Sequence, residues 1–308
     1  MDTEERDDHD QRFKALLREF LPEFVALFFP EWAARLDLTS VEWLEQEAFI
    51  DPPGGEKRVL DVVAKVPTRD PVPDPGGRSA THSVVVVNVE IESSDRATDI
   101  RPRMLWYYEH LRHRYSLPVL PVCLFLKVGL NGIGWDAYQE RLWDHPLLRF
   151  EYAYIGLPAL DGMTYYNGAN LLGLALSALM KLPATDRARI KAEGMARIAR
   201  AQENSARAAL LAECFDNYLE LTAADVPEYE RLQKEQFPEG EQVVNSIEER
   251  GRVKERREIL AAQLAQKFGP LSDDATARLA QLPPKRLSEL TLAVLTAQSL
   301  KELGLADE

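Results

Sequence analysis

Cysteine is scarce in this chain: Cys123 and Cys214 are the only two among 308 residues. Two cysteines cannot build a disulfide framework, and no histidines stand beside them at the spacing of a zinc site. No run of 18 or more apolar residues occurs, so a membrane span is not expected. The N-terminal residues MDTEERDDHDQ also lack the basic and then apolar order of a signal peptide. We therefore expect a cytoplasmic protein with no membrane partner.

A surplus of basic residues is missing as well. The chain has 37 basic and 50 acidic residues, which gives a formal net charge of −13. A protein that coats nucleic acid by bulk electrostatic attraction is not expected with this balance, because the phosphate backbone is itself negative. An enzyme that acts on nucleic acid needs only a local basic surface beside its site, so that class stays open.

Segments of strand and helix character alternate through the first part of the chain. Helical spacing over residues 10–36 is interrupted by Pro22 and Pro30. Residues 67–82 hold several prolines and predict a loop, and residues 98–115 predict a helix that begins near Thr98 or Asp99. Patterns of β-branched and apolar residues predict strands at 43–50, 58–66, 83–92, 117–128 and 150–157. This order indicates an α/β fold, with a mixed sheet flanked by helices.

The composition changes after Pro183. Residues 186–221 are rich in alanine and charge and predict a helical extension. Pro227, Pro238 and Gly240 lie among many Glu and Gln residues, which is typical of a linker. Helical patterns then continue to the end, with a stop at Gly269-Pro270 and a new start at Ser272. The expected domains are an α/β core at 1–183, a helical extension at 184–224, a linker at 225–245 and a small helical domain at 246–308.

Three carboxylates belong to the two strands with the clearest patterns. Side chains alternate along a strand, so Asn88, Glu90 and Glu92 share one face, with the two glutamates about 6.6 Å apart. Asp61 belongs to the preceding strand, and pairing of the two strands would bring it beside Glu90. Two carboxylates from neighbouring strands predict a Mg²⁺ site, because this ion prefers oxygen ligands. Such an ion polarises a phosphoryl oxygen and activates water, as phosphodiester hydrolysis requires.

Other interpretations of these carboxylates remain open. Burial of like charges is costly unless something positive compensates, and Lys65, Arg96 or Arg103 could do so in place of a metal ion. If the strand at 83–92 lies at an edge of the sheet, its glutamates are ordinary surface charges. Asp61 by itself would most simply be a solvated or salt-bridged residue.

Four short motifs also resemble a known family. They are D-x-x-F-K at Asp10, Phe13 and Lys14, V-L-D-V-V at 59–63, V-E-I-E-S at 89–93 and R-M-L-x-Y at 103–107. Over residues 8–220 the chain resembles the recombination-promoting nuclease and transposase-like branch of the PD-(D/E)XK superfamily. Residues 246–305 resemble a bacterial helical domain of unknown function that often follows such nucleases.

The resemblance implies a restriction-endonuclease-like fold and specific residue roles. Asp61 and Glu90 would bind Mg²⁺ or Mn²⁺. Glu92 falls where the family name has Lys and where this branch often has Gln, so it would act as a base or a ligand instead. The proline that usually precedes the first aspartate is Leu60 here. Asp10 and Lys14 would be auxiliary residues on the first helix. Phosphate groups would be bound by Arg96, Arg101 and Arg103.

Two functions follow as expectations. The first is a metal-dependent DNA endonuclease, with Asp61, Glu90 and Glu92 as catalytic residues and DNA as partner. The second is a nuclease-fold protein without activity that serves in protein interaction. Three features favour it: glutamate at position 92 in place of the family's Lys or Gln, the negative net charge and the helical tail. Under either function, the helical C-terminal region would suit a homodimer.

Overall fold

A computed structural model describes residues 3–44, 48–51, 56–74, 81–94, 96, 99–201, 203–294 and 297–305 of the chain. The fold divides into two compact units, Met1–Glu241 and Gln242–Glu308, each with its own core. Across the described residues, none of the helices combines the length and apolarity needed to cross a membrane.

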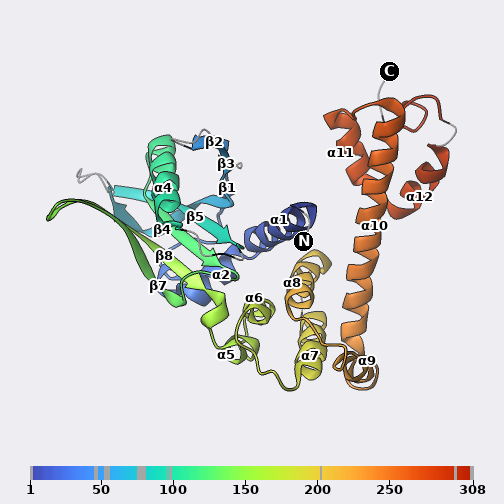
Figure 1. Cartoon of the computed structure of the whole chain (residues 1–308), viewed down its shortest axis with the longest axis horizontal. Coiled ribbons are helices and arrows are strands. Elements are labelled where there is room, and N and C mark those ends of the chain that lie inside the picture. The colour runs from blue at the N-terminus through green and yellow to red at the C-terminus, as the bar shows by residue number, and fades with distance from the viewer. Residues whose placement is uncertain are drawn as a thin grey trace. The chain divides into compact units, whose positions relative to one another are not determined.

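The first unit is built on a six-stranded mixed sheet with the strand order β1-β4-β5-β6-β8-β7. The β1–β4, β4–β5 and β7–β8 pairs are antiparallel, whereas β5–β6 and β6–β8 are parallel. The expected α/β class with a mixed sheet and flanking helices is therefore confirmed (Figure 1). The strands are β1 (Glu42–Trp43), β4 (Val62–Pro73), β5 (Thr81–Glu92), β6 (Val119–Phe125), β7 (Gly132–Leu142) and β8 (His145–Gly156).

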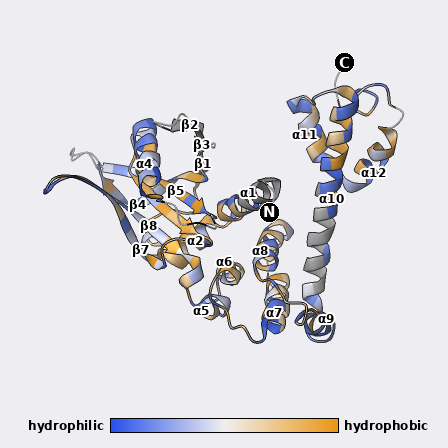
Figure 2. Ribbon diagram, viewed as in Figure 1, coloured by the Kyte–Doolittle hydropathy of each residue, from blue (hydrophilic) through white to orange (hydrophobic). Residues whose placement is uncertain are grey.

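Strand β5 lies inside the sheet, between β4 and β6, and its last eight residues are buried. The unbroken valines from Val84 to Val87 suit this position, because both faces of the strand are covered. Helix α4 (Arg101–Tyr115) connects the parallel strands β5 and β6 and packs on one face of the sheet through Met104, Tyr107 and Leu111. Figure 2 shows hydrophobic residues concentrated on the strands of this sheet.

The N-terminal segment folds as three helices, α1 (Thr3–Glu19), α2 (Leu21–Phe28) and α3 (Pro30–Ala33). The breaks predicted at Pro22 and Pro30 are confirmed, since each proline occupies the first turn of the helix that follows. Helix α1 contacts β4, and this contact brings its side chains to the end of the sheet where β4 begins.

The strand expected at 58–66 is in fact two strands with different partners. Strand β3 (Glu56–Val59) pairs with β2 (Ala48–Asp51) in a separate two-stranded sheet, and β4 begins at Val62 in the main sheet. Leu60 and Asp61 lie between them. Leu60 is buried beneath α4, so the chain changes partners without leaving the core.

The loop expected at 67–82 is wrong for residues 67–73, which continue β4, and for residues 81–82, which open β5. Strand β1 pairs with Ala64 and Lys65, and Leu36 forms a bridge with Thr68, so among the described residues this edge of β4 is unpaired from Asp70 onward. Prolines are tolerated at such an edge and at bulges, and the β4–β5 register shifts between Pro67 and Val72. Residues 75–80 of this prediction lie outside the described part of the chain.

Strand β7 has no counterpart among the predicted strands. It is an edge strand whose last four residues are exposed, and charged residues interrupt its apolar pattern. It forms a hairpin with β8, which covers the strand predicted at 150–157. The strand expected at 117–128 is shorter than predicted and ends at Phe125.

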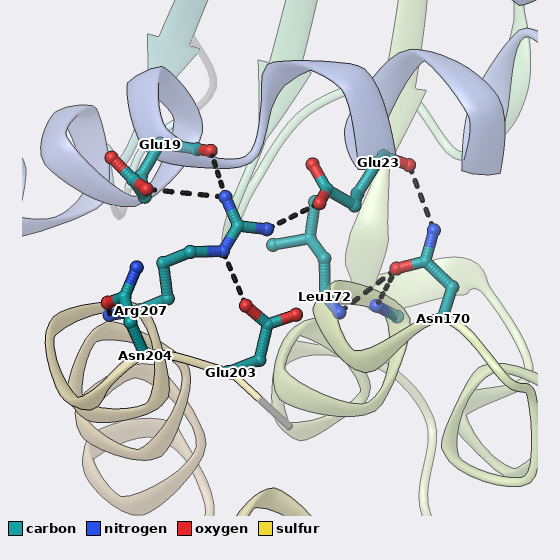
Figure 3. A network of polar contacts seen from close by, with 8 residues as sticks. Glu19, Glu23, Asn170, Leu172, Glu203, Asn204 and Arg207 are labelled. Atoms are coloured by element: carbon teal, nitrogen blue, oxygen red, sulfur yellow. Dashed lines mark hydrogen bonds and ion pairs between the residues drawn. The ribbon is translucent and has the colours of Figure 1, made fainter. Parts of the chain in front are cut away.

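A helical layer follows the sheet and packs against the N-terminal helices. Arg207 of α8 donates hydrogen bonds to the Glu19 carbonyl oxygen at 2.8 Å, to a Glu23 carboxylate oxygen, and to Glu203 Oε2 at 2.6 Å. Asn170 caps α6 and also donates to the Glu23 carbonyl oxygen at 2.9 Å (Figure 3). The helices of this layer are η1 (Leu157–Ala159), α5 (Gly162–Tyr166), α6 (Leu171–Leu176), η2 (Ser177–Leu179), α7 (Arg187–Arg200) and α8 (Ser205–Tyr218).

The linker expected at 225–245 is helical in the structure. Pro227 lies in the first turn of α9 (Val226–Glu235), and α10 (Pro238–Phe268) begins at Pro238. The first turn of a helix tolerates proline, because its N–H groups have no partner inside the helix. The residues that predicted a linker are therefore helix starts.

The second unit contains most of α10 together with α11 (Asp273–Gln281) and α12 (Pro284–Ala293). Its core includes Leu260, Leu264, Leu287 and Leu290. The predicted boundary is confirmed: Gly269 has a φ of 88°, and Ser272 Oγ accepts a hydrogen bond from the N–H of Ala275.

Candidate functional site

The three predicted carboxylates come together where β4 begins and β5 ends. Val62 pairs with Val89, so the next positions along the two strands place Asp61 opposite Glu90. Asp61 Oδ2 accepts a hydrogen bond of 2.8 Å from the N–H of Ile91, which fixes the aspartate against β5. Asp61, Glu90 and Glu92 are 7%, 4% and 6% exposed. They are therefore not solvated surface charges.

Two cations reach these carboxylates from different helices. Lys14 of α1 places its Nζ 2.8 Å from Asp61 Oδ1. Arg103 of α4 places one terminal nitrogen 2.5 Å from Glu92 Oε2 and its Nε 3.5 Å from Glu90 Oε1. Glu92 Oε1 also accepts from the N–H of Ser94 at 3.0 Å. The cluster thus holds one more carboxylate than cations.

Glu90 is the least satisfied member of this cluster. Among the described residues, its Oε2 is buried with no hydrogen-bond partner, and its Oε1 lies 3.5 Å from Arg103 Nε. Burial, and then the charge of Asp61, raise the pKa of Glu90 well above its ordinary value of 4.5, against the pull of Arg103 and Lys14. A divalent cation beside Glu90 would remove this penalty on its charged form.

Arg103 stays protonated in spite of its burial. Desolvation alone would lower the pKa of the guanidinium, but the charges of Glu90 and Glu92 and the neighbouring Tyr107 raise it above its ordinary value. Arg103 therefore keeps its positive charge beside the two glutamates.

Two further polar residues line the same face of the sheet. Cys123 of β6 lies beside Glu90 in register, and burial raises the pKa of its thiol well above the ordinary value. Because the thiolate is the metal-binding form, Cys123 is not a ligand in this state. Asn88 is fully buried, and neither Oδ1 nor Nδ2 has a hydrogen-bond partner. The sequence placed Asn88 on the glutamate face, but only the structure reveals its missing partners.

The three arginines expected to bind phosphate have different surroundings in the structure. Arg101 pairs with Asp136 Oδ2 at 2.9 Å, away from the carboxylate cluster. Arg96 is exposed, and its N–H bonds to Ser94 Oγ at 3.2 Å. Arg103, expected to bind phosphate, points at Glu90 and Glu92, because its face of α4 covers the sheet. The side chain of Asp10 lies outside the described residues.

Of the two compensating cations, Arg103 was among those suggested by the carboxylate pattern, whereas Lys14 was expected only as an auxiliary residue on the first helix. Lys65 pairs instead with Glu42 at 2.8 Å on the neighbouring strand β1. Only Arg103 of the expected residues contacts the glutamates, and Lys14 supplies the second charge. Lys14 comes from a helix some fifty residues earlier in the sequence, so local spacing could not have placed it.

The donor set suits a hard cation. No group of three or more His, Cys, Asp or Glu side chains that could hold a metal ion occurs within the described residues. Mg²⁺, however, needs only one or two protein carboxylates and keeps several waters. Asp61 and Glu90 supply two carboxylates at opposed cross-strand positions, and Glu90 Oε2, which has no hydrogen-bond partner among the described residues, is the atom best placed to gain a ligand.

The fold and the site define an α/β protein whose mixed sheet carries a buried cluster of acidic and basic side chains. Comparison of the chain with protein-family models, with curated proteins and with solved structures found no match.

Proposed function

We propose that the chain is a Mg²⁺- or Mn²⁺-dependent endonuclease that hydrolyses phosphodiester bonds of DNA. The observation that carries the proposal is the opposition of Asp61 and Glu90 across β4 and β5, where both are buried and where burial and the charge of Asp61 raise the pKa of Glu90. Buried like charges at adjacent positions persist in a fold only where a positive partner repays their cost. In a metal-dependent hydrolase, the bound divalent cation would offset the unfavourable free energy of burying these two carboxylates.

The residues of the cluster then have separate roles. Asp61 and Glu90 hold the cation, which would supply Lewis acidity toward a phosphoryl oxygen and activate water. Lys14 and Arg103 stabilise negative charge that develops on the phosphate, in a place from which water is largely excluded. Glu92 orients Arg103 through their 2.5 Å contact. Asp61 is held in position by the N–H of Ile91.

The architecture supports the same proposal. Helix α1 contacts β4, which pairs antiparallel with β5, and α4 then connects β5 to the parallel strand β6. This order is similar to the core of restriction-endonuclease-like folds, in which the acidic residues lie on the hairpin strands. We assign the chain to the PD-(D/E)XK superfamily as part of the proposal, together with the motifs at 59–63 and 89–93.

A specific observation favours a second function. The ion pairs Lys14–Asp61 and Arg103–Glu92 already engage two of the three carboxylates. A nuclease fold that has lost its metal can keep its acidic residues by such pairing, and would then serve in protein interaction. Homodimerisation through the helical second unit would suit that role and stays a prediction.

The two functions are separated by a plasmid assay. Purified protein is incubated with supercoiled plasmid and Mg²⁺ or Mn²⁺, beside Asp61→Asn and Glu90→Gln. The nuclease predicts nicking that falls by about 100-fold or more in both variants, as expected when electrostatic stabilisation is lost. Glu151→Gln is the matched control, because Glu151 is half exposed and pairs with Arg149 on the same strand.

Two results would decide against the nuclease. Nicking that persists in both variants would remove the carboxylates from the reaction and indicate a contaminating enzyme. A wild-type protein that is inactive and does not bind either cation would favour the interaction role.

A further inference from the structure

Asn88 is the least expected residue in the centre of the sheet. It is 0% exposed, lies between Val87 and Val89 in β5, and has no hydrogen-bond partner for either amide atom among the described residues. An unpartnered amide in an apolar interior is strongly unfavourable, and such groups are rare in folded proteins. Its presence therefore requires a ligand or a role.

Within the sheet, Asn88 has a single polar neighbour on its own face. Across β4 it faces Val63, and across β6 it faces Pro121, which has no N–H to donate. Along its own strand the adjacent positions on this face are Val86 and Glu90. Glu90 is thus the one polar residue among these four, and its Oε2 is likewise buried without a partner.

We propose that Asn88 belongs to the cation site and that its amide oxygen holds the ion, directly or through one coordinated water. An amide oxygen is a suitable donor for Mg²⁺ and Mn²⁺, which take oxygen ligands. The ion would satisfy Glu90 Oε2 and Asn88 Oδ1 at once, two buried acceptors that the fold leaves open. Asp61 and Glu90 supply the charge, and Asn88 adds a neutral ligand without further repulsion.

The inference rests on the cation site of the proposed function, but it does not require that the chain cleave DNA. The decisive measurement is therefore the binding of Mn²⁺ in the absence of DNA. It is monitored by titration calorimetry and by the rise in melting temperature that the ion produces. Three variants are compared with the wild type: Asn88→Val, which removes the amide, Asn88→Asp, which keeps an oxygen donor, and Val86→Ala, the matched control on the same face.

Asn88→Val is expected to weaken Mn²⁺ binding by about 10- to 100-fold, the range found when groups that support a metal site are removed. Asn88→Asp should bind at least as tightly as the wild type. Val86→Ala loses packing and melts at a lower temperature, but its Mn²⁺ affinity should be unchanged. Without metal, Asn88→Val should melt no lower than the wild type, because an unpartnered amide has been replaced by an apolar side chain.

Wild-type affinity in Asn88→Val would overturn the inference and indicate that Asn88 is satisfied by buried water alone. A wild-type protein that binds no Mn²⁺ would overturn it as well. If Asn88→Val fails to fold, the comparison of Asn88→Asp with Asn88→Ser takes its place, and equal affinities of those two variants would sink the proposal. Tight binding without plasmid nicking would refute the nuclease and leave the role of Asn88 standing.

Discussion

Lys14 Nζ lies 2.8 Å from Asp61 Oδ1, and both side chains are only 9% exposed. The pair joins the first helix of the chain to the start of β4. Because neither residue reaches bulk water, each is the main compensation for the charge of the other. This ion pair makes the position of α1 depend on the carboxylate cluster.

Lys14→Met should therefore destabilise the fold strongly. Removal of one partner from a buried ion pair leaves an uncompensated charge and costs about 3–5 kcal/mol. Urea denaturation measures the free energy of unfolding. Lys65→Met is the control, since Lys65 pairs with the largely exposed Glu42 and should lose much less. Equally small losses of unfolding free energy in the two variants would contradict a buried ion pair between Lys14 and Asp61. The double variant Lys14→Met/Asp61→Asn should recover part of the stability that Lys14→Met loses.

The pKa of Glu90 predicts how stability changes with pH. Since burial and Asp61 raise this pKa in the folded chain, the folded state keeps a proton that the unfolded state has released. The contribution of Glu90 is full below its ordinary pKa of 4.5 and is lost as the pH rises through the folded value. Glu90→Gln should thus raise the melting temperature at about pH 8 and have little effect at about pH 4.

Calorimetric melting curves across this pH range provide the measurement. Glu151→Gln, at an exposed position, serves as the control. Its difference in melting temperature from the wild type should not increase from low to high pH. A Glu90→Gln difference that stays constant over the range would show that Glu90 titrates normally. Addition of Mg²⁺ to the wild type should reduce the advantage of the variant at high pH, because the ion favours the charged carboxylate.

A lysine in place of Glu92 should destabilise this fold. In Glu92→Lys the new ammonium would face Arg103, whose terminal nitrogen lies 2.5 Å from Glu92 Oε2. The change removes the main partner of a largely buried guanidinium and adds a like charge, so a loss of about 3–5 kcal/mol is expected. Chemical denaturation tests this, with Glu92→Gln as the milder comparison. Partial recovery in Glu92→Lys/Arg103→Ala is expected, and a fully stable single variant would refute the assigned contact.

Arg207 provides a test of the helical layer. It connects α8 to α1 and α2 through Glu19 and Glu23, and its guanidinium lies 3.9 Å from the ring centre of Phe20. Arg207→Ala should lower the free energy of unfolding by about 1.5–3 kcal/mol, the scale of hydrogen bonds to charged groups. Arg231→Ala should change it far less, because Arg231 bonds only within α9 and is half exposed. Similar losses of unfolding free energy in the two variants would show that the contacts of Arg207 do not stabilise the packing of the helical layer on α1 and α2.

Patterns that depend on neighbours along the chain predicted the fold best. The valines of β5, the prolines that open α2 and α3, and the cap at Ser272 act within a few residues, so periodicity and capping rules find them. Predictions based on proline and glycine as breakers were less successful. Pro71 lies inside β4 and Pro227 inside the first turn of α9, because an edge and a helix start both tolerate a missing N–H.

For the site, the sequence by itself determined that Glu90 and Glu92 share a strand face and that Asp61 precedes a neighbouring strand, since side-chain alternation is a property of the backbone. Only the tertiary structure decided which cations meet them and which atoms remain unsatisfied. Lys14 and Arg103 arrive on helices whose placement depends on packing of the whole core. The open amide of Asn88 likewise follows from what surrounds it in space, because burial and hydrogen bonding are set by residues distant in the chain.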